Sequence, residues 1–288
     1  MWVAPDGHEI RAIEWPDPPA GTALRGSILF MAGRGDAYEK YLESFEHWHL
    51  RGWRVTAADW RGQGGSGRLG KDDSTGHIDD FALWIADLAH FWRDWAEGRQ
   101  GPLVLAGHSM GGYGTWVVGM THPEVFNAIW AQSACCVSPR TETPESAAAM
   151  AAVPRDGVDD SGFGMRAGLA SATAWAPDPT NPPFYVQWPL AEDGSVDQHV
   201  IAQWAANSPY AMVASHVSAL ESFAAIGSDV GTEDGLIADD TLISQQLGKF
   251  GVEHIFETYE GNHVNRIGER FSSVVLPFMA EHLDMGDQ

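Results

Sequence analysis

The sequence predicts an α/β fold in which a mostly parallel sheet is flanked by helices. Short apolar segments rich in Val, Ile, Leu and Phe alternate with longer segments of helical periodicity. This alternation is typical of parallel strands joined by crossover helices. Two features interrupt it: a glycine-flanked serine at 107–111 and a long irregular segment at 138–218.

The predicted elements follow in chain order. Residues 2–15 predict an N-terminal hairpin that turns at 5–7, where proline, aspartate and glycine follow one another. Short apolar runs predict core strands at 27–31, 54–58, 103–106, 127–132, 223–226 and 254–258. The stretches between these runs predict helices at 38–50, 78–96, 110–121, 240–250 and 266–282.

The segment 138–218 has a composition of its own. Proline is frequent in it, alanine and aromatic residues are scattered, and no strand period persists. Long irregular segments inside compact domains are often functional. We therefore expect one α/β core formed by residues 1–137 and 219–288, with residues 138–218 inserted between two core strands as a cap or lid over a site.

Composition and charge exclude several classes of function. The formal net charge is −22, whereas nucleic-acid binding requires a basic surface for the phosphates. No apolar run in the sequence approaches the ~20 residues of a membrane span. The first residues lack the basic and apolar parts of a signal peptide. We expect a cytoplasmic protein without nucleic-acid or membrane partners; the sequence leaves its oligomeric state open.

The two cysteines of the chain, Cys135 and Cys136, are adjacent. Their Cα atoms are therefore about 3.8 Å apart, which is shorter than the separation that disulfides usually adopt. We interpret them as two reduced thiols at the end of a strand.

Gly107-His108-Ser109-Met110-Gly111 matches the G-x-S-x-G pattern. An apolar strand precedes it and a helix-compatible stretch follows, so the pattern predicts a sharp strand-to-helix turn with Ser109 at its apex. Such a turn holds a serine hydroxyl clear of its own backbone, and the flanking glycines avoid collisions with the neighbouring strand and helix. The pattern indicates Ser109 as a nucleophile, with the backbone N–H of Met110 directed at the developing oxyanion.

A base must follow the serine and an acid must lie between them in the sequence. His263 lies between the last predicted strand and the last predicted helix. That loop would lie at the same sheet edge as Ser109, so we predict His263 as the base. His254 and His282 fall inside a predicted strand and helix, and His108 is held in the turn itself. We interpret these three histidines as edge, surface or packing residues.

The acid is expected after the strand at 223–226. Asp234 would orient His263 and stabilise its protonated form. Asp229 lies five residues earlier, nearer the strand end, and is the main alternative. Glu233 and Asp239 are weaker candidates, because carboxylates in such positions are more often loop or helix-start residues.

The second oxyanion donor is expected in the loop after the strand at 27–31. Gly33 and Gly35 would let its backbone approach the site, and we expect the donor to be the N–H of Arg34 or of a residue next to it. The G-x-G-x-x-G pattern at 62–67 does not predict a dinucleotide site. Neither a strand ending at its first glycine nor a helix starting at its last is indicated. We predict neither a cofactor nor a metal ion.

Over nearly its whole length the chain resembles the α/β-hydrolase superfamily. Residues 27–35 and 59–67 resemble lysophospholipase and monoacylglycerol-lipase relatives, although Ala32-Gly33 stands where these usually have a His-Gly pair. The second half resembles esterase D-type proteins, which include S-formylglutathione hydrolases, in residues 109–114, 122–126, 229–237 and 260–263. The resemblance implies the α/β-hydrolase fold and Asp234 as the acid, in agreement with the choice made from the residues.

The sequence thus predicts a serine hydrolase that cleaves small-molecule carboxylic esters through an acyl-enzyme on Ser109. A thioesterase or an acyltransferase would use the same residues. A non-catalytic binding protein can share the fold. These alternatives stay open at the level of the sequence.

Overall fold

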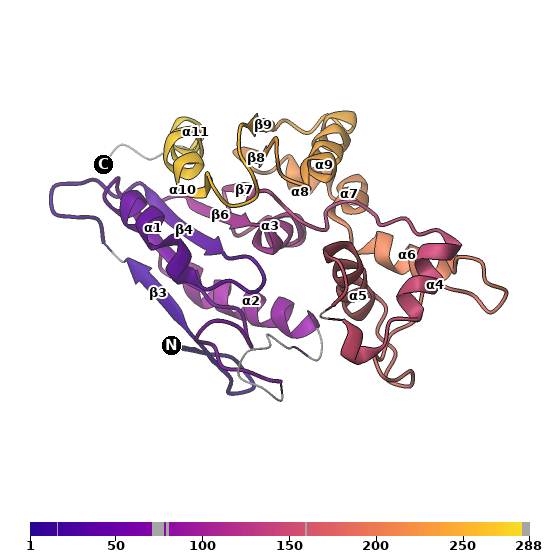
Figure 1. Cartoon of the computed structure of the whole chain (residues 1–288). Helices are drawn as coiled ribbons and strands as arrows, with labels where there is room; N and C mark the ends of the chain where they lie inside the picture. Colours follow the sequence, from indigo (N-terminus) through magenta and orange to yellow (C-terminus); the bar gives the residue numbers. More distant parts are fainter. Residues whose placement is uncertain (16, 71–77, 79–80, 159, 284–288) are drawn as a thin grey trace. The chain divides into compact units, whose positions relative to one another are not determined.

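The computed structural model describes residues 1–288 except 16, 71–77, 79–80, 159 and 284–288. The chain divides into two compact units, residues 1–137 with 213–288 and residues 138–212. The first unit contains the sheet, and the second consists of helices and loops (Figure 1). The second unit ends at Met212, so residues 213–218, which the sequence placed in the insertion, belong to the first unit.

Seven strands of the described residues form the main sheet of the first unit, in the order β3-β5-β4-β6-β7-β8-β9. Neighbouring strands are parallel except β3, which pairs antiparallel with β5. The bounds are β3 Ala12–Trp15, β4 Gly26–Met31, β5 Trp53–Ala58, β6 Leu103–His108, β7 Ala128–Gln132, β8 Ala225–Gly231 and β9 Ile255–Tyr259. The predicted α/β class with a mostly parallel sheet is confirmed.

The N-terminal segment divides between two sheets. β1 (Trp2–Val3) and β2 (Glu9–Ile10) form an antiparallel hairpin around the predicted turn, where Gly7 has a φ of 88°. The predicted hairpin is therefore confirmed for residues 2–10. It is wrong for β3, which leaves the hairpin and pairs with β5 at the edge of the main sheet.

The central strands are buried at nearly every position, because helices cover both faces of the sheet. β4, β7 and β8 have no exposed residue, which explains why they appear as continuous apolar runs or small residues rather than alternating ones. β8 starts later and extends further than the predicted strand at 223–226. Its second half contains Gly227, Ser228 and Asp229, residue types that are rare in strands.

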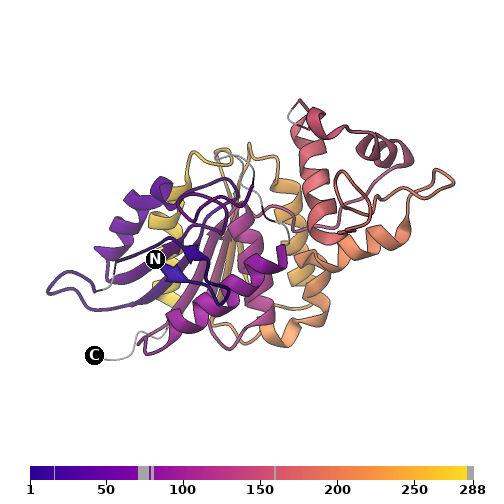
Figure 2. The ribbon, with the colours of Figure 1, turned by 90° about the horizontal axis from the view of Figure 1, so that it is seen from below.

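Helices α1, α10 and α11 pack on one face of the sheet, and α2 and α3 lie on the other (Figure 2). Phe45 and Trp48 of α1 share one apolar cluster with Phe271 and Met279 from the C-terminal helical segment. The helical bounds in this unit are η1 Tyr38–Tyr41, α1 Leu42–His49, α2 Phe81–Ala96, α3 Met110–Thr121, η3 Val213–Ser215, α8 Val217–Leu220, α9 Ile237–Lys249, α10 Ile267–Arg270, η4 Phe271–Val275 and α11 Leu276–His282. The predicted helices at 38–50 and 266–282 thus contain a 3₁₀ turn and a π turn.

The second unit has a small core of its own. Its helical segments are α4 Pro144–Ala151, η2 Arg155–Gly157, α5 Phe163–Trp175, α6 Gln198–Ala206 and α7 Pro209–Met212. Thr143 begins α4 with a capping box, and the Asp197 side chain accepts hydrogen bonds at the start of α6. Met150, Leu169 and Trp204 are buried together between these helices.

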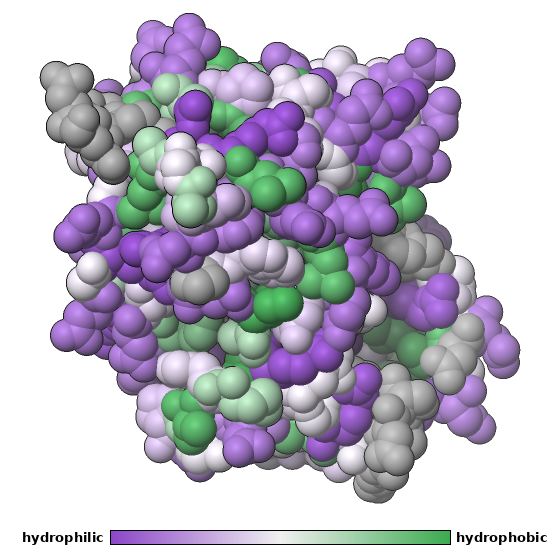
Figure 3. Space-filling view, turned by 90° about the vertical axis from the view of Figure 1, so that its left-hand side faces the viewer, coloured by the Kyte–Doolittle hydropathy of each residue, from purple (hydrophilic) through white to green (hydrophobic). Residues whose placement is uncertain are grey.

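Hydrophilic residues cover most of the face in Figure 3, and hydrophobic residues lie between them in small groups. Such a distribution is ordinary for a protein surface. Among the described residues, no helix is both long and apolar enough to cross a membrane.

Candidate active site

Ser109 lies between β6 and α3 in a backbone conformation that L-residues rarely adopt. Its φ is 59° and its ψ −118°, and such conformations cost about 1–3 kcal/mol each. Three backbone contacts hold it: its N–H donates to the carbonyl of Gln132 at 3.0 Å, and its carbonyl accepts from the N–H groups of Tyr113 at 3.1 Å and Cys135 at 3.2 Å. The turn leaves the serine only partly buried at the carboxyl end of β6.

Close contacts require the two glycines that flank this turn. A Cβ at Gly107 would lie 2.2 Å from the carbonyl oxygen of Gly111. A Cβ at Gly111 would lie 1.9 Å from the carbonyl oxygen of Met31. Both distances are shorter than any real Cβ contact. The start of α3 therefore packs directly on β6 and on the end of β4.

His263 and Asp234 form a hydrogen-bonded pair. His263 Nδ1 lies 2.8 Å from Asp234 Oδ2, and the Asp234 side chain is 3% exposed against 35% for His263. Burial alone would raise the pKa of Asp234, but hydrogen bonds from His263 and from the N–H of Leu236 outweigh it, so the pKa is lowered. The carboxylate thus accepts a hydrogen bond from the Nδ1–H of His263, and Nε2 is left as the basic nitrogen.

Backbone contacts fix the two loops that carry this pair. The N–H of Glu233 donates to the carbonyl of Gly261 at 2.9 Å, and a Cβ at Gly231 would lie 2.2 Å from that same oxygen. On the other side, His108 Nε2 donates to the carbonyl of His263 at 2.8 Å, and the two imidazole rings are 4.7 Å apart. The His263 loop therefore lies against the residue that precedes Ser109.

The alternative acids lie elsewhere. Asp229 is inside β8, where Arg270 Nε donates to its Oδ2 at 2.7 Å and Trp130 Nε1 lies 3.4 Å from its Oδ1. Burial raises the pKa of Asp229 to about 6 in spite of Arg270. Glu233 is exposed, and Asp239 is in the first turn of α9. Of the four carboxylates considered from the sequence, Asp234 is the one that the structure brings to His263.

The loop after β4 lies against the nucleophile. A Cβ at Gly33 would lie 3.2 Å from the Cβ of Ser109. The N–H of Gly35 donates to Oε1 of Gln63, and Trp60 Nε1 donates to the carbonyl of Ala32 at 2.9 Å. Since the N–H of Gly35 is engaged by Gln63, the neighbouring Arg34 remains the better candidate for the second oxyanion donor. Met110 is the first residue of α3, where the N–H has no partner inside the helix.

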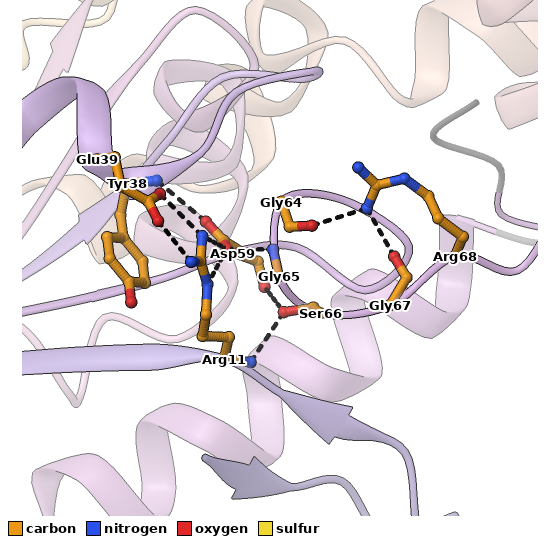
Figure 4. Close-up of polar contacts among 9 residues, drawn as sticks. All are labelled: Arg11, Tyr38, Glu39, Asp59, Gly64, Gly65, Ser66, Gly67 and Arg68. Atoms are coloured by element: carbon orange, nitrogen blue, oxygen red, sulfur yellow. Dashed lines mark hydrogen bonds and ion pairs between the residues drawn. The ribbon is translucent and has the colours of Figure 1, made fainter. Parts of the chain in front are cut away.

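The glycine-rich loop 59–67 contacts the segment that follows β4 (Figure 4). The carboxylate of buried Asp59 accepts from Arg11 Nε at 2.6 Å, from the N–H of Gly65 at 2.7 Å and from the N–H of Tyr38 at 3.0 Å. A Cβ at Gly64 would lie 2.2 Å from the Asp59 carboxylate, which requires glycine there. Through these contacts and those of Trp60 and Gln63, the loop holds both ends of the segment 32–38.

Sequence reasoning missed the role of this loop. The pattern at 62–67 does not predict a dinucleotide site, and it does not indicate a role for Trp60 or Gln63. The available signal was positional: the loop follows β5, which is the neighbour of β4 in the sheet, so both loops emerge at one edge.

His108 links three parts of the site, so the interpretation as a packing residue was incomplete. A carbonyl oxygen only accepts, so Nε2 of His108 carries the proton that is donated to His263. Its Nδ1 lies 3.2 Å from the Tyr41 hydroxyl, which in turn donates to Asp36 Oδ2 at 2.8 Å. Burial, and then the nearby charge of His263, lowers the pKa of His108 to about 4. The chain of contacts runs from the loop after β4 to the His263 loop.

The buried neutral His108 should make stability depend on pH. Its pKa rises from about 4 in the folded chain to about 6.5 on unfolding. Between these values the unfolded chain binds more protons, so stability present above pH 6.5 is lost as the pH falls towards 4, by a total of order 3 kcal/mol. As the pH falls from 6.5 towards 4, the free energy of unfolding of the wild type should therefore decrease relative to that of His108→Gln. Urea denaturation of both proteins over this pH range measures the change. Parallel curves would contradict this assignment.

A strained serine at the carboxyl edge of a parallel sheet, with a histidine–aspartate pair whose histidine lies on the loop that contacts the residue before the serine, defines an α/β-hydrolase. The chain belongs to the family described as serine aminopeptidase, S33 (Hydrolase_4), whose sequence model matches residues 22–237. The predicted fold and the resemblance to this superfamily are confirmed.

Individual relatives share smaller parts of the sequence. The chain is 40% identical over 107 residues to lysophospholipase L2 of Escherichia coli strain K12, a match that covers 35% of this chain and 30% of that protein. The structure is similar to Est1E from Butyrivibrio proteoclasticus in complex with ferulic acid, with a TM-score of 0.63 and 17% identity over 98% of both chains. S-formylglutathione hydrolase from Staphylococcus aureus has a TM-score of 0.52 and 12% identity, over 94% of this chain and 98% of that one.

Proposed function

We propose that the chain is a serine hydrolase of carboxylic esters that works without a cofactor through an acyl-enzyme on Ser109. The observation that carries the proposal is the His263–Asp234 pair, whose loop is hydrogen-bonded to the residue before the strained serine. The match to lysophospholipase L2 supports an ester substrate, although it covers 30% of that protein.

The proposed reaction has two steps. Ser109 attacks the ester carbonyl while Nε2 of His263 removes its proton, and His263 then protonates the leaving alcohol. Water attacks the acyl-enzyme with His263 again acting as the base. Asp234 keeps the Nδ1 proton in place and stabilises the imidazolium that forms in each step.

The negative charge of the tetrahedral intermediate would be stabilised by two backbone N–H groups. Met110 provides one at the start of α3, and Arg34 is proposed to provide the other from the loop that lies against Ser109. Such donors are already oriented before the reaction, so they cost no reorganisation when the charge develops.

A panel of activated substrates tests the proposal. We expect a fluorophosphonate to add once to the wild type and a p-nitrophenyl ester to be hydrolysed faster than its thioester analogue and than an aminoacyl p-nitroanilide. A faster thioester would indicate a thioesterase, a faster anilide would indicate an aminopeptidase, and a product ester formed from an added alcohol would indicate an acyltransferase. A folded protein without any adduct would be a binding protein on this fold.

Gln63 should affect catalysis more than folding. Its side chain is 2% exposed, and within the described part of the chain nothing pairs with its Nε2. An unpaired buried amide costs about 1–3 kcal/mol, so Gln63→Met should leave stability unchanged or raise it. Loss of the Gly35 contact should move the proposed Arg34 donor and lower kcat by about 10- to 100-fold, with KM nearly unchanged.

Gln245→Met is the matched control, because Gln245 is an exposed glutamine on α9. Steady-state kinetics and thermal unfolding of both variants separate the two effects. Normal kcat in a folded Gln63→Met protein would show that this contact does not position the donor.

A further inference from the structure

Cys135 and Cys136 form a close pair of thiols on the loop after β7. Neither is in a disulfide, and the Cys136 thiol donates to Sγ of Cys135 over 3.2 Å. In an extended segment successive side chains point to opposite sides. Cys136 instead has a φ of 61°, and this turn brings both sulfur atoms to one side of a loop whose two residues are partly buried.

The pair lies next to the proposed nucleophile. The N–H of Cys135 donates to the carbonyl of Ser109 at 3.2 Å, and Gln132, three residues earlier, accepts from the N–H of Ser109. The loop therefore holds the serine from both sides. The guanidinium of Arg34 is close enough for its charge to interact with both thiols, which places the pair beside the loop after β4 as well.

The geometry disfavours a disulfide and favours a bridging ligand. Adjacent residues have Cα atoms about 3.8 Å apart, below the usual range of disulfides. A large thiophilic atom can bind both sulfurs without drawing them into an S–S bond, and soft ligands of this kind select thiolates. The neighbouring thiol of Cys136, together with burial, raises the pKa of the Cys135 thiol, so reagents that attack one thiolate should react slowly.

We propose that Cys135 and Cys136 form a bidentate binding site for trivalent arsenicals and that its occupation slows the reaction at Ser109. An organoarsine oxide, R–As=O, condenses with the two thiols. Two As–S bonds form, both S–H bonds and the As=O bond break, and the two protons leave with the oxygen as water. Arsenic stays trivalent, so no oxidant or reductant is needed. The second As–S bond closes a ring at high effective concentration.

The bound arsenical adds bulk on the loop that holds Ser109 and beside Arg34. Displacing a reacting group by about 1 Å can cost 10²-fold in rate, so hydrolysis should fall by about that factor. Binding itself does not depend on catalysis and should be equal in Ser109→Ala. The site can therefore be tested even if the proposed function is wrong.

The experiment uses phenylarsine oxide at one equivalent, with intact mass and ester hydrolysis as readouts. We expect one adduct on the wild type and on Ser109→Ala that is removed by 2,3-dimercaptopropanol but survives the same concentration of 2-mercaptoethanol. Cys135→Ser and Cys136→Ser should lose the adduct in 2-mercaptoethanol. Ester hydrolysis by these variants should not be inhibited by phenylarsine oxide. N-ethylmaleimide should label the folded wild type more slowly than phenylarsine oxide does.

Two results would overturn the proposal. An adduct that either single-cysteine variant retains in 2-mercaptoethanol would show that the site is not bidentate. A full adduct on the wild type with unchanged hydrolysis would show that its occupation does not reach Ser109.

Discussion

Ser109→Ala is expected to lower the kcat for an ester by roughly a millionfold. In serine hydrolases the nucleophile, base and acid act as a unit, so removal of the serine abolishes almost all of the rate enhancement that they provide together. A residual rate above that in water would come from substrate binding and from the oxyanion donors. The fold should not change, since alanine would adopt the same backbone conformation, with a φ of 59°, as serine does. The backbone contacts of the turn do not involve the hydroxyl.

Fluorophosphonate labelling followed by intact mass, with steady-state kinetics, measures this loss. Ser222→Ala is the matched control, because Ser222 is an exposed serine of the same unit. The control should label and turn over like the wild type. Labelling of a folded Ser109→Ala protein, or near-normal turnover by it, would remove Ser109 from the reaction.

The sheet shows which parts of the fold the sequence can predict. Core strands such as β4 and β7 are local apolar runs, so their pattern predicts them directly. The sequence places β3 in the hairpin, because nothing inside its four residues indicates that its partner is β5, more than thirty residues later. The sequence pattern ends β8 too early, because glycine, at position 227, is a poor strand former. Its lack of a side chain makes room for the Trp130 ring, which a Cβ would approach to 2.2 Å.

The candidate site shows the same division between local and distant causes. Ser109 and His263 could be predicted because a motif and a position between elements identify them. Gln63 and Trp60 could not, because they act through contacts with a loop about thirty residues away in the chain. The choice between Asp234 and Asp229 stayed open for a related reason. The partner that occupies Asp229 is Arg270, and no spacing rule connects them.

Asp234 and Asp229 can be separated by paired substitutions to asparagine. Asp234→Asn should lower kcat by about 10⁴-fold, because an amide in place of the carboxylate can favour the wrong tautomer of His263 and cannot stabilise its protonated form. The structure leaves no second carboxylate on His263 Nδ1 among the described residues. Fluorophosphonate labelling should slow in parallel with kcat, because the attack on the reagent requires the same base.

Asp229→Asn should leave kcat and the labelling rate unchanged, since this side chain bonds to Arg270 and lies beside Trp130. Arg270 keeps its ion pair with Glu257, so the expected cost is a loss of stability of about 1–3 kcal/mol, measured by urea denaturation. The reverse pattern, with kinetics lost in Asp229→Asn and retained in Asp234→Asn, would require His263 to turn away from the carboxylate that it contacts. A large kinetic loss confined to Asp234→Asn would instead mean that the hydrogen bond between Asp234 and His263 serves the reaction, whereas the buried pair of Asp229 and Arg270 serves the fold.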